Sequence, residues 1–159
     1  MIAEDIRTLA ILDWLENDLL MTILGLEPAS SDASFRRYFR AKTPAGQFII
    51  MDAPPDKENT EPFIRIGTLL SNAGLHVPAI FQTNSHDGFL LLEDFGSASY
   101  LDQLNANTAD PLYQSAFDSL LRLQSDHSLQ NNGLPSYNEQ LLKRELGIFA
   151  EWFLGHFLD

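Results

Sequence analysis

The segment at residues 31–35 has the composition of a loop that could bind an anion. It consists of Ser31, Asp32, Ala33, Ser34 and Phe35. Small side chains let backbone N–H groups approach a phosphate closely, so phosphate binding is the chemistry expected here. The negative charge of Asp32 does not help such binding. Taken alone, the segment fits an ordinary hairpin turn better than a binding loop.

A second segment, residues 93–96, spells Glu-Asp-Phe-Gly and follows a short apolar run. Its last three letters are those of the metal-binding triplet of protein kinases, but that triplet must follow a His-x-Asp loop with a downstream asparagine. No such loop precedes Asp94 in this sequence. The position after a strand instead favours a hinge whose main-chain groups read the edge of an adenine. A plain strand-end turn closed by Gly96 is the alternative.

Other candidates for chemistry are weaker. The histidines lack metal-ligand spacing, no Ser/His/Asp constellation is recognisable, and the absence of cysteine excludes disulfides and thiolate metal sites. In the basic run at residues 36–40, strand alternation places Arg36, Tyr38 and Arg40 on one face. Arg37 and Phe39 fall on the other face. The run is either a solvated strand face or the source of an arginine that reaches a phosphate.

Five strands and a helix are expected to position these segments. Alternation, apolar runs and turn signals predict strands near residues 26–29, 36–42, 48–51, 80–83 and 89–92. Pro28 indicates an edge strand, whereas the continuous apolar run at 48–51 indicates a central one. A helix is expected to start after Asn59-Thr60 and to stop near Gly74.

Helices are also expected at both ends of the chain. Residues 5–20 predict an amphipathic helix whose apolar stripe includes Ile6, Leu9 and Leu20, with Trp14 off the stripe. Residues 113–125 and 138–158 read as helical. We therefore expect an α+β unit at residues 1–96 and a helical unit at 97–159. The last helix is so apolar that we expect the sequence to stop short of a natural domain end at Asp159.

The composition limits the partners. A chain of 159 residues with net charge −12 and a pI of about 4.5 repels nucleic-acid phosphates and anionic membranes, so neither is an expected partner. The N-terminus has no basic region followed by a long apolar run, so no secretory signal is expected. Apolar stretches are too short to cross a bilayer. These features are compatible with the cytoplasm, and the oligomeric state stays open.

The order of these motifs resembles the aminoglycoside phosphotransferase family, which has a protein-kinase-like fold. More narrowly, it is similar to the bacterial anomeric kinases of N-acetylmuramate and N-acetylglucosamine used in cell-wall recycling. The resemblance covers essentially the whole chain, but only the first half of a family member. The matching stretches are SDASFRRYFR (31–40), FIIMDAPP (48–55), AGLHVPAIF (73–81) and GFLLLEDFG (88–96).

The resemblance implies a small lobe with a five-stranded antiparallel sheet that binds ATP, followed by the first helices of a large lobe. Residues 31–35 would lie over the phosphates, Ile49 would face the adenine, and Leu92 would hold the gatekeeper position. Glu93, Asp94 and Phe95 would form the hinge. The catalytic aspartate and the Mg²⁺ ligands of the family would lie beyond Asp159.

One departure from the family pattern concerns a lysine. Related kinases pair a lysine on the third strand with a glutamate on the following helix to hold the phosphates. Here the strand reads Ile50-Met51-Asp52, and the helix position is near Ile64. An arginine of residues 36–40, Lys57 or Arg65 is left to replace the lysine, unless Mg²⁺ and backbone groups act alone.

Three functions follow. The first is an ATP-dependent phosphotransferase acting on a sugar hydroxyl, with these 159 residues inactive by themselves. The second is a non-catalytic kinase-like module that binds a nucleotide or a protein. The third is an acidic α+β domain without a nucleotide site, which titration with Mg·ATP would separate from the others. A reading frame that continues past Asp159 with His-x-Asp-x₄-Asn would favour the enzyme over the module.

Overall fold

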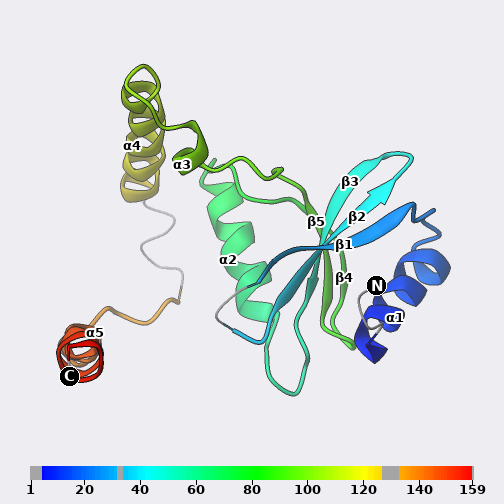
Figure 1. The fold of residues 1–159 in the computed structure, drawn as a ribbon, viewed down its shortest axis with the longest axis horizontal. Helices are drawn as coiled ribbons and strands as arrows, with labels where there is room; N and C mark the ends of the chain where they lie inside the picture. Colours follow the sequence, from blue (N-terminus) through cyan, green and yellow to red (C-terminus); the bar gives the residue numbers. More distant parts are fainter. Residues whose placement is uncertain (1–4, 32–33, 127–132, 159) are drawn as a thin grey trace. The chain divides into compact units, whose positions relative to one another are not determined.

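The computed structural model describes residues 5–31, 34–126 and 133–158, and its centre is a five-stranded antiparallel sheet ordered β1-β2-β3-β5-β4 (Figure 1). The expected α+β fold class is confirmed. So are the hairpins β2–β3 and β4–β5, the edge position of the strand that carries Pro28, and the central position of residues 48–51. The strands are β1 (Gly25–Ser31), β2 (Arg37–Thr43), β3 (Gly46–Asp52), β4 (Ile80–Asn84) and β5 (Phe89–Glu93).

Helices cover the two faces of this sheet separately. Helix α1 (Ile6–Asp13), which continues into the π-helical segment η1 (Trp14–Asp18), packs on one face. Helix α2 (Glu61–Asn72) packs on the other, and Figure 1 shows the two helices on opposite sides of the sheet. We call these the α1 face and the α2 face. Because strand side chains alternate, each residue of the sheet belongs to only one of them.

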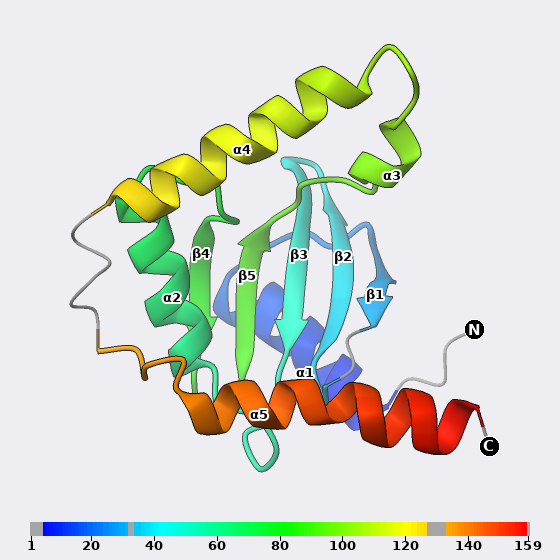
Figure 2. The same ribbon diagram turned by 90° about the vertical axis from the view of Figure 1, so that its left-hand side faces the viewer.

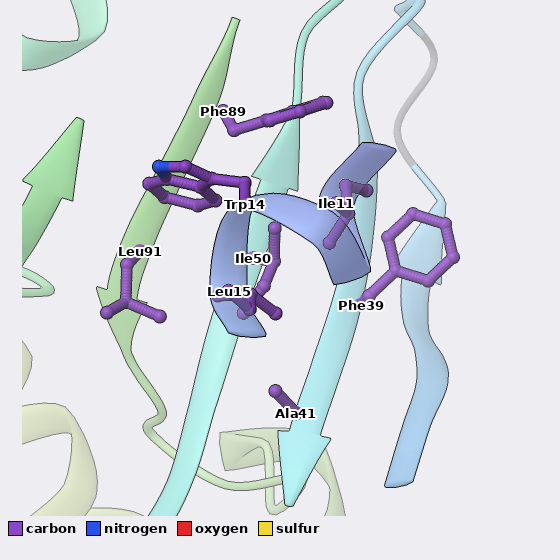
Figure 3. Packing of buried hydrophobic residues seen from close by; sticks show 8 residues of the cluster. All are labelled: Ile11, Trp14, Leu15, Phe39, Ala41, Ile50, Phe89 and Leu91. Atoms are coloured by element: carbon purple, nitrogen blue, oxygen red, sulfur yellow. The ribbon is translucent and has the colours of Figure 1, made fainter. Parts of the chain in front are cut away.

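The core of the α1 face is aromatic and closely packed (Figure 3). Trp14 lies against Phe89 with ring centroids 5.8 Å apart, and Ile11 and Leu15 are fully buried beside them. The prediction that Trp14 lies off the buried stripe is therefore wrong, and so is the expected stripe of Ile6, Leu9 and Leu20, which are exposed. The buried stripe also includes Thr8, a polar residue whose N–H and hydroxyl both donate to Asp5 Oδ1. A hydrophobicity pattern does not reveal such a position.

The core of the α2 face is aliphatic. Met51 and Leu90 are fully buried, and Phe63 and Ile64 of α2 pack against them. The helix starts as expected, because Asn59 Oδ1 accepts the Glu61 N–H at 2.9 Å and a proline occupies the first turn. It ends before Gly74, whose φ of +74° lies in the left-handed region.

The remaining helices follow the sheet in sequence. They are α3 (Tyr100–Gln103), α4 (Ala109–Ser125), α5 (Glu139–Ile148) and the π-helical η3 (Phe149–Phe157). The chain forms two compact units, Met1–Asp126 and His127–Asp159. Within the first unit, Arg122 of α4 donates from Nη1 to the Gly74 carbonyl at 2.5 Å, which fastens α4 to the end of α2. The lobe boundary at residue 96 stays a prediction.

Figure 2 shows the sheet face-on, with β4 and β1 at its two edges and α2 on the side facing the viewer. Among the described residues, no helix combines the length and the apolar character that crossing a membrane requires.

Candidate functional site

A pocket of about 460 Å³ opens on the α2 face, where the chain leaves β5. Its wall combines residues of strands β1, β2, β3 and β5, one residue of α2, Pro78 before β4 and the segment that follows β5. They are Ala29, Ser30, Tyr38, Arg40, Ile49, Phe63, Pro78, Leu92, Glu93, Asp94, Phe95, Gly96 and Ser97.

The strand register explains why three of these side chains share one wall. Arg40 of β2 is the Cα partner of Ile49 in β3, and Ile49 is the partner of Leu92 in β5. Residues that pair across an antiparallel sheet point to the same face. Ile49 and Leu92 therefore form an adjacent apolar surface, with the charged Arg40 at its end. Such a surface suits a flat, largely apolar ring.

The charge of Arg40 is held by Asp94. Arg40 Nε lies 2.6 Å from Asp94 Oδ2 and Nη2 lies 3.0 Å from Oδ1, so the pair is bidentate. Its members are 17% and 5% exposed. Hydrogen bonds from the Arg40 guanidinium and from the Gly96 N–H hold the pKa of the Asp94 carboxyl below its ordinary value. The same pair raises the pKa of Arg40. Asp94 is thus an anion held in one position at the start of the segment that follows β5.

The segment after β5 is also anchored through its backbone. The Glu93 N–H donates to the Ala79 carbonyl at 2.9 Å, and the Ala79 N–H donates back to Glu93 Oε2 at 3.1 Å. Phe95 packs against His76 with ring centroids 4.5 Å apart. Within the described part of the chain, the Phe95 N–H has no protein acceptor and can meet a ligand.

The pocket brings together half of the residues that the sequence indicated. Ile49, Leu92, Glu93, Asp94 and Phe95 all line it. Of the residues expected over a phosphate, the described Ser34 and Phe35 are not among its lining residues.

Those phosphate-loop residues lie at the edge of the described structure. Ser31 ends β1, and Ser34 and Phe35 precede β2. Asp32 and Ala33 lie outside the described residues. The Phe35 N–H donates to Glu58 Oε1 at 3.1 Å, so the described part of the loop contacts the connection between β3 and α2.

Sequence reasoning missed the partnership of Arg40 with Asp94, which are separated by 54 positions. Alternation along β2 was the available signal, and its assignment of Tyr38 and Arg40 to one face is confirmed because both line the pocket. Arg37 lies on the opposite face, also as expected. There it donates to Asp52 Oδ2 at 2.9 Å and pairs with Asp5, so it is not a ligand-binding group of this pocket.

Residues 25–154 match the Phosphotransferase enzyme family. An N-acetylmuramate/N-acetylglucosamine kinase of Pseudomonas putida is 44% identical over 161 residues, covering 95% of this chain and 47% of that kinase. The kinase of the same name from Pseudomonas aeruginosa is 45% identical over 133 residues, covering 84% of this chain and 39% of that protein.

A more distant kinase of that name, from Neisseria meningitidis, is 29% identical over 154 residues, covering 94% of this chain and 45% of that protein. The resemblance read from the motifs is therefore confirmed. The chain spans about half the length of these relatives.

Proposed function

Because this chain belongs to the phosphotransferase enzyme family, we propose that the whole protein is an ATP-dependent kinase of an amino-sugar hydroxyl. The proposed acceptor is the anomeric hydroxyl of N-acetylmuramate or N-acetylglucosamine, the sugars in the names of the relatives. The reaction would serve cell-wall recycling in the cytoplasm, where ATP is available.

The observation that carries the proposal is the pocket on the α2 face. Its apolar wall of Ile49 and Leu92 offers a surface for a purine, and the Phe95 N–H offers a donor to the purine edge. The bidentate pair of Arg40 with Asp94 holds the segment that carries this N–H in place. Residues 31–35 are proposed to lie over the phosphates, which would extend from the pocket toward the β1–β2 connection.

Mg²⁺ is the expected companion of the nucleotide, but the described residues do not fit its site. They include no group of three histidine, aspartate or glutamate side chains that could hold a metal ion. Asp94, the carboxylate in the pocket, is already bound by Arg40. We therefore place the metal ligands, like the catalytic aspartate, in the part of the protein that these residues do not include.

Phosphoryl transfer depends mainly on positioning and electrostatic stabilisation. This chain is proposed to contribute the positioning of the nucleotide, with residues 1–96 as the small lobe and 97–159 as the start of the large one. The 159 residues contain no His-x-Asp-x₄-Asn loop. We therefore expect them to show no turnover by themselves.

A coupled assay for ADP release tests the activity of the full-length protein. We expect turnover with N-acetylglucosamine and N-acetylmuramate, and none with the methyl glycoside of N-acetylglucosamine, in which the anomeric hydroxyl is blocked. Turnover of the methyl glycoside would move the reaction to another hydroxyl. Absence of turnover with any sugar of a broad panel would reject the sugar-kinase function.

Titration of the full-length protein with adenosine and with Mg·ATP, in the absence of sugar, tests the pocket separately. Ile49→Trp should fill the apolar wall and abolish binding of both. Leu24→Trp is a matched control, because Leu24 is 68% exposed and does not line the pocket. Equal affinities of the two variants would place the nucleotide elsewhere.

A non-catalytic nucleotide-binding module is the second candidate. It is favoured by the third strand, which reads Ile50-Met51-Asp52 where related kinases carry a lysine. Nucleotide binding by the full-length protein without turnover on any sugar would support this candidate.

A further inference from the structure

The negative net charge of this chain opposes the binding of any polyanionic ligand. With a net charge of −12, the protein needs a local cation wherever a triphosphate is to bind. All lysine and arginine residues fall within the described part of the chain, so each can be examined.

Most of these cations already have an anionic or carbonyl partner. Asp52 pairs with both Arg7 and Arg37, and Asp94 pairs with Arg40. Lys42 pairs with Glu27, Lys143 with Glu139, and Arg144 with Glu145. Arg122 donates to the Gly74 carbonyl. Arg36 donates to Ser34 Oγ, and both Arg36 and Arg65 have further interactions.

Lys57 differs from all of them. Among the described residues, its ammonium contacts no carboxylate, carbonyl or hydroxyl group; it lies over the ring of Phe35, 5.0 Å from the centroid. The Pro54 carbonyl accepts the N–H groups of Lys57 at 2.9 Å and of Glu58 at 2.8 Å, which makes a tight turn. Glu58 in turn accepts the Phe35 N–H at 3.1 Å. The turn therefore holds an exposed, unpaired ammonium on the described part of the 31–35 loop.

The loop connects this ammonium to the pocket. Ser30 and Tyr38 are Cα partners at the two sides of the β1–β2 connection, and both line the pocket. Phe35 lies on the chain between them. A ligand that extends from the pocket toward the connection would thus approach Phe35 and Lys57.

The third strand, on which related kinases carry the lysine, supplies no cation here. Met51 is fully buried and packs in the cluster that includes Phe63 and Ile64 of α2. The α2 residues that pack against this strand are apolar, so no lysine–glutamate ion pair joins them there. The phosphate charge must be met from another element.

We propose that Lys57 is the phosphate-binding cation of this chain, and that its ammonium leaves the Phe35 ring to pair with phosphate oxygens of the nucleotide. This inference rests on the proposed function. An exposed cation–π contact is weaker than a charge-assisted hydrogen bond to phosphate, so the exchange is favourable. The hydrogen bond from Phe35 to Glu58 keeps the loop and the turn together while the ammonium changes partner.

The test compares Lys57→Ala, Lys57→Arg and Lys143→Ala in the full-length protein by calorimetric titration with Mg·ATP and with adenosine, without sugar. Lys143 is the matched control, because it is an exposed lysine that pairs with Glu139 outside the first unit. We expect Lys57→Ala to weaken Mg·ATP binding at least about fivefold and to leave adenosine binding unchanged. Lys57→Arg should keep most of the affinity, and Lys143→Ala should match the wild type.

The outcomes separate this inference from the proposed function. If the wild type binds both ligands and Lys57→Ala binds Mg·ATP equally well, Lys57 is not the phosphate cation. An equal loss for Mg·ATP and adenosine would also overturn the inference, because the effect would then lie in the purine pocket. A wild type that binds neither ligand would reject the nucleotide site, and with it the role of Lys57.

Discussion

The two faces of the sheet use arginines of the same strand for different purposes. On the α1 face, Arg37 and Arg7 both donate to Asp52, whose side chain is fully buried, and together they fasten α1 to the sheet. On the α2 face, Arg40 donates to Asp94 at the wall of an open pocket. Arginine–aspartate ion pairs thus stabilise a closed core on one side and shape the wall of an open pocket on the other.

The difference between the faces lies in what surrounds each pair. Asp52 lies between the sheet and α1, where Arg7 bonds to it. Arg7 Nη2 also donates to the Asp87 carbonyl at 2.5 Å. Asp94 lies in a segment that leaves the sheet, so its partner fixes the direction of the chain. Removing a charge should therefore cost mainly stability on the α1 face, whereas on the α2 face it should cost both stability and ligand affinity.

The largest effect is expected at Asp52. Asp52→Ala removes the carboxylate shared by Arg7 and Arg37, and breaking a buried ion pair should lower the free energy of unfolding by about 4 kcal/mol. Urea denaturation followed by tryptophan fluorescence measures this, since Trp14 lies in the same core. A loss below about 1 kcal/mol would show that the pair is dispensable for the α1 face.

The next effect concerns Met51 on the α2 face. Met51→Lys places an ammonium in a fully buried aliphatic position and should destabilise the fold by about 3 kcal/mol. The double variant Met51→Lys with Ile64→Glu should recover part of this loss, because it supplies the missing anion. Met51→Leu, the size-matched control, should cost less than about 1.5 kcal/mol. No recovery in the double variant would mean that these two positions do not face each other.

A smaller effect is expected at Asp94. Asp94→Asn should lower the free energy of unfolding by about 1–2 kcal/mol, because it removes a charge-assisted bidentate pair at a partly open site. It should also weaken nucleotide binding, since the segment that carries the Phe95 N–H loses its anchor. Denaturation and nucleotide titration on the same preparations separate the two effects. Unchanged affinity would remove Asp94 from the site.

The direction in which pH changes the stabilisation by Asp94 can be predicted. The pKa of Asp94 is lowered in the folded protein by Arg40 and by the Gly96 N–H. Its contribution is therefore present above the ordinary carboxyl pKa of about 4 and is lost as the pH falls through the lower folded value. The stability gap between the wild type and Asp94→Asn should shrink below about pH 4. A gap that stays constant down to pH 2 would contradict the ion pair.

The smallest effect is expected for the exposed pair of Lys42 with Glu27, which calibrates the other pairs. Glu27→Gln should change the free energy of unfolding by no more than about 0.5 kcal/mol, because both side chains are close to half exposed. The change should vanish in 1 M salt, where the charges are screened over about 3 Å. A loss of unfolding free energy as large as that at Asp94 would show that the contribution of an ion pair does not depend on its exposure.

Much of the fold follows from local patterns. The strands, both hairpins and α2 were readable because alternation, apolar runs and turn residues act over a few neighbouring positions. The order of motifs also indicated the family, and the pocket residues Ile49 and Leu92 followed from it. The α1 stripe was misread because Thr8, a polar residue, occupies one of its buried positions.

The sequence by itself determined the main strands and helices, their order and the absence of a lysine from the third strand, since each is a property of neighbouring residues. Only the tertiary structure decided which charges meet. Arg40 and Asp94 are 54 positions apart, and Arg7 and Asp52 are 45 apart. Their distances depend on the strand register and on the packing of α1, which a one-dimensional pattern does not contain. For the same reason, the position of Lys57 over Phe35 became visible only in the folded chain.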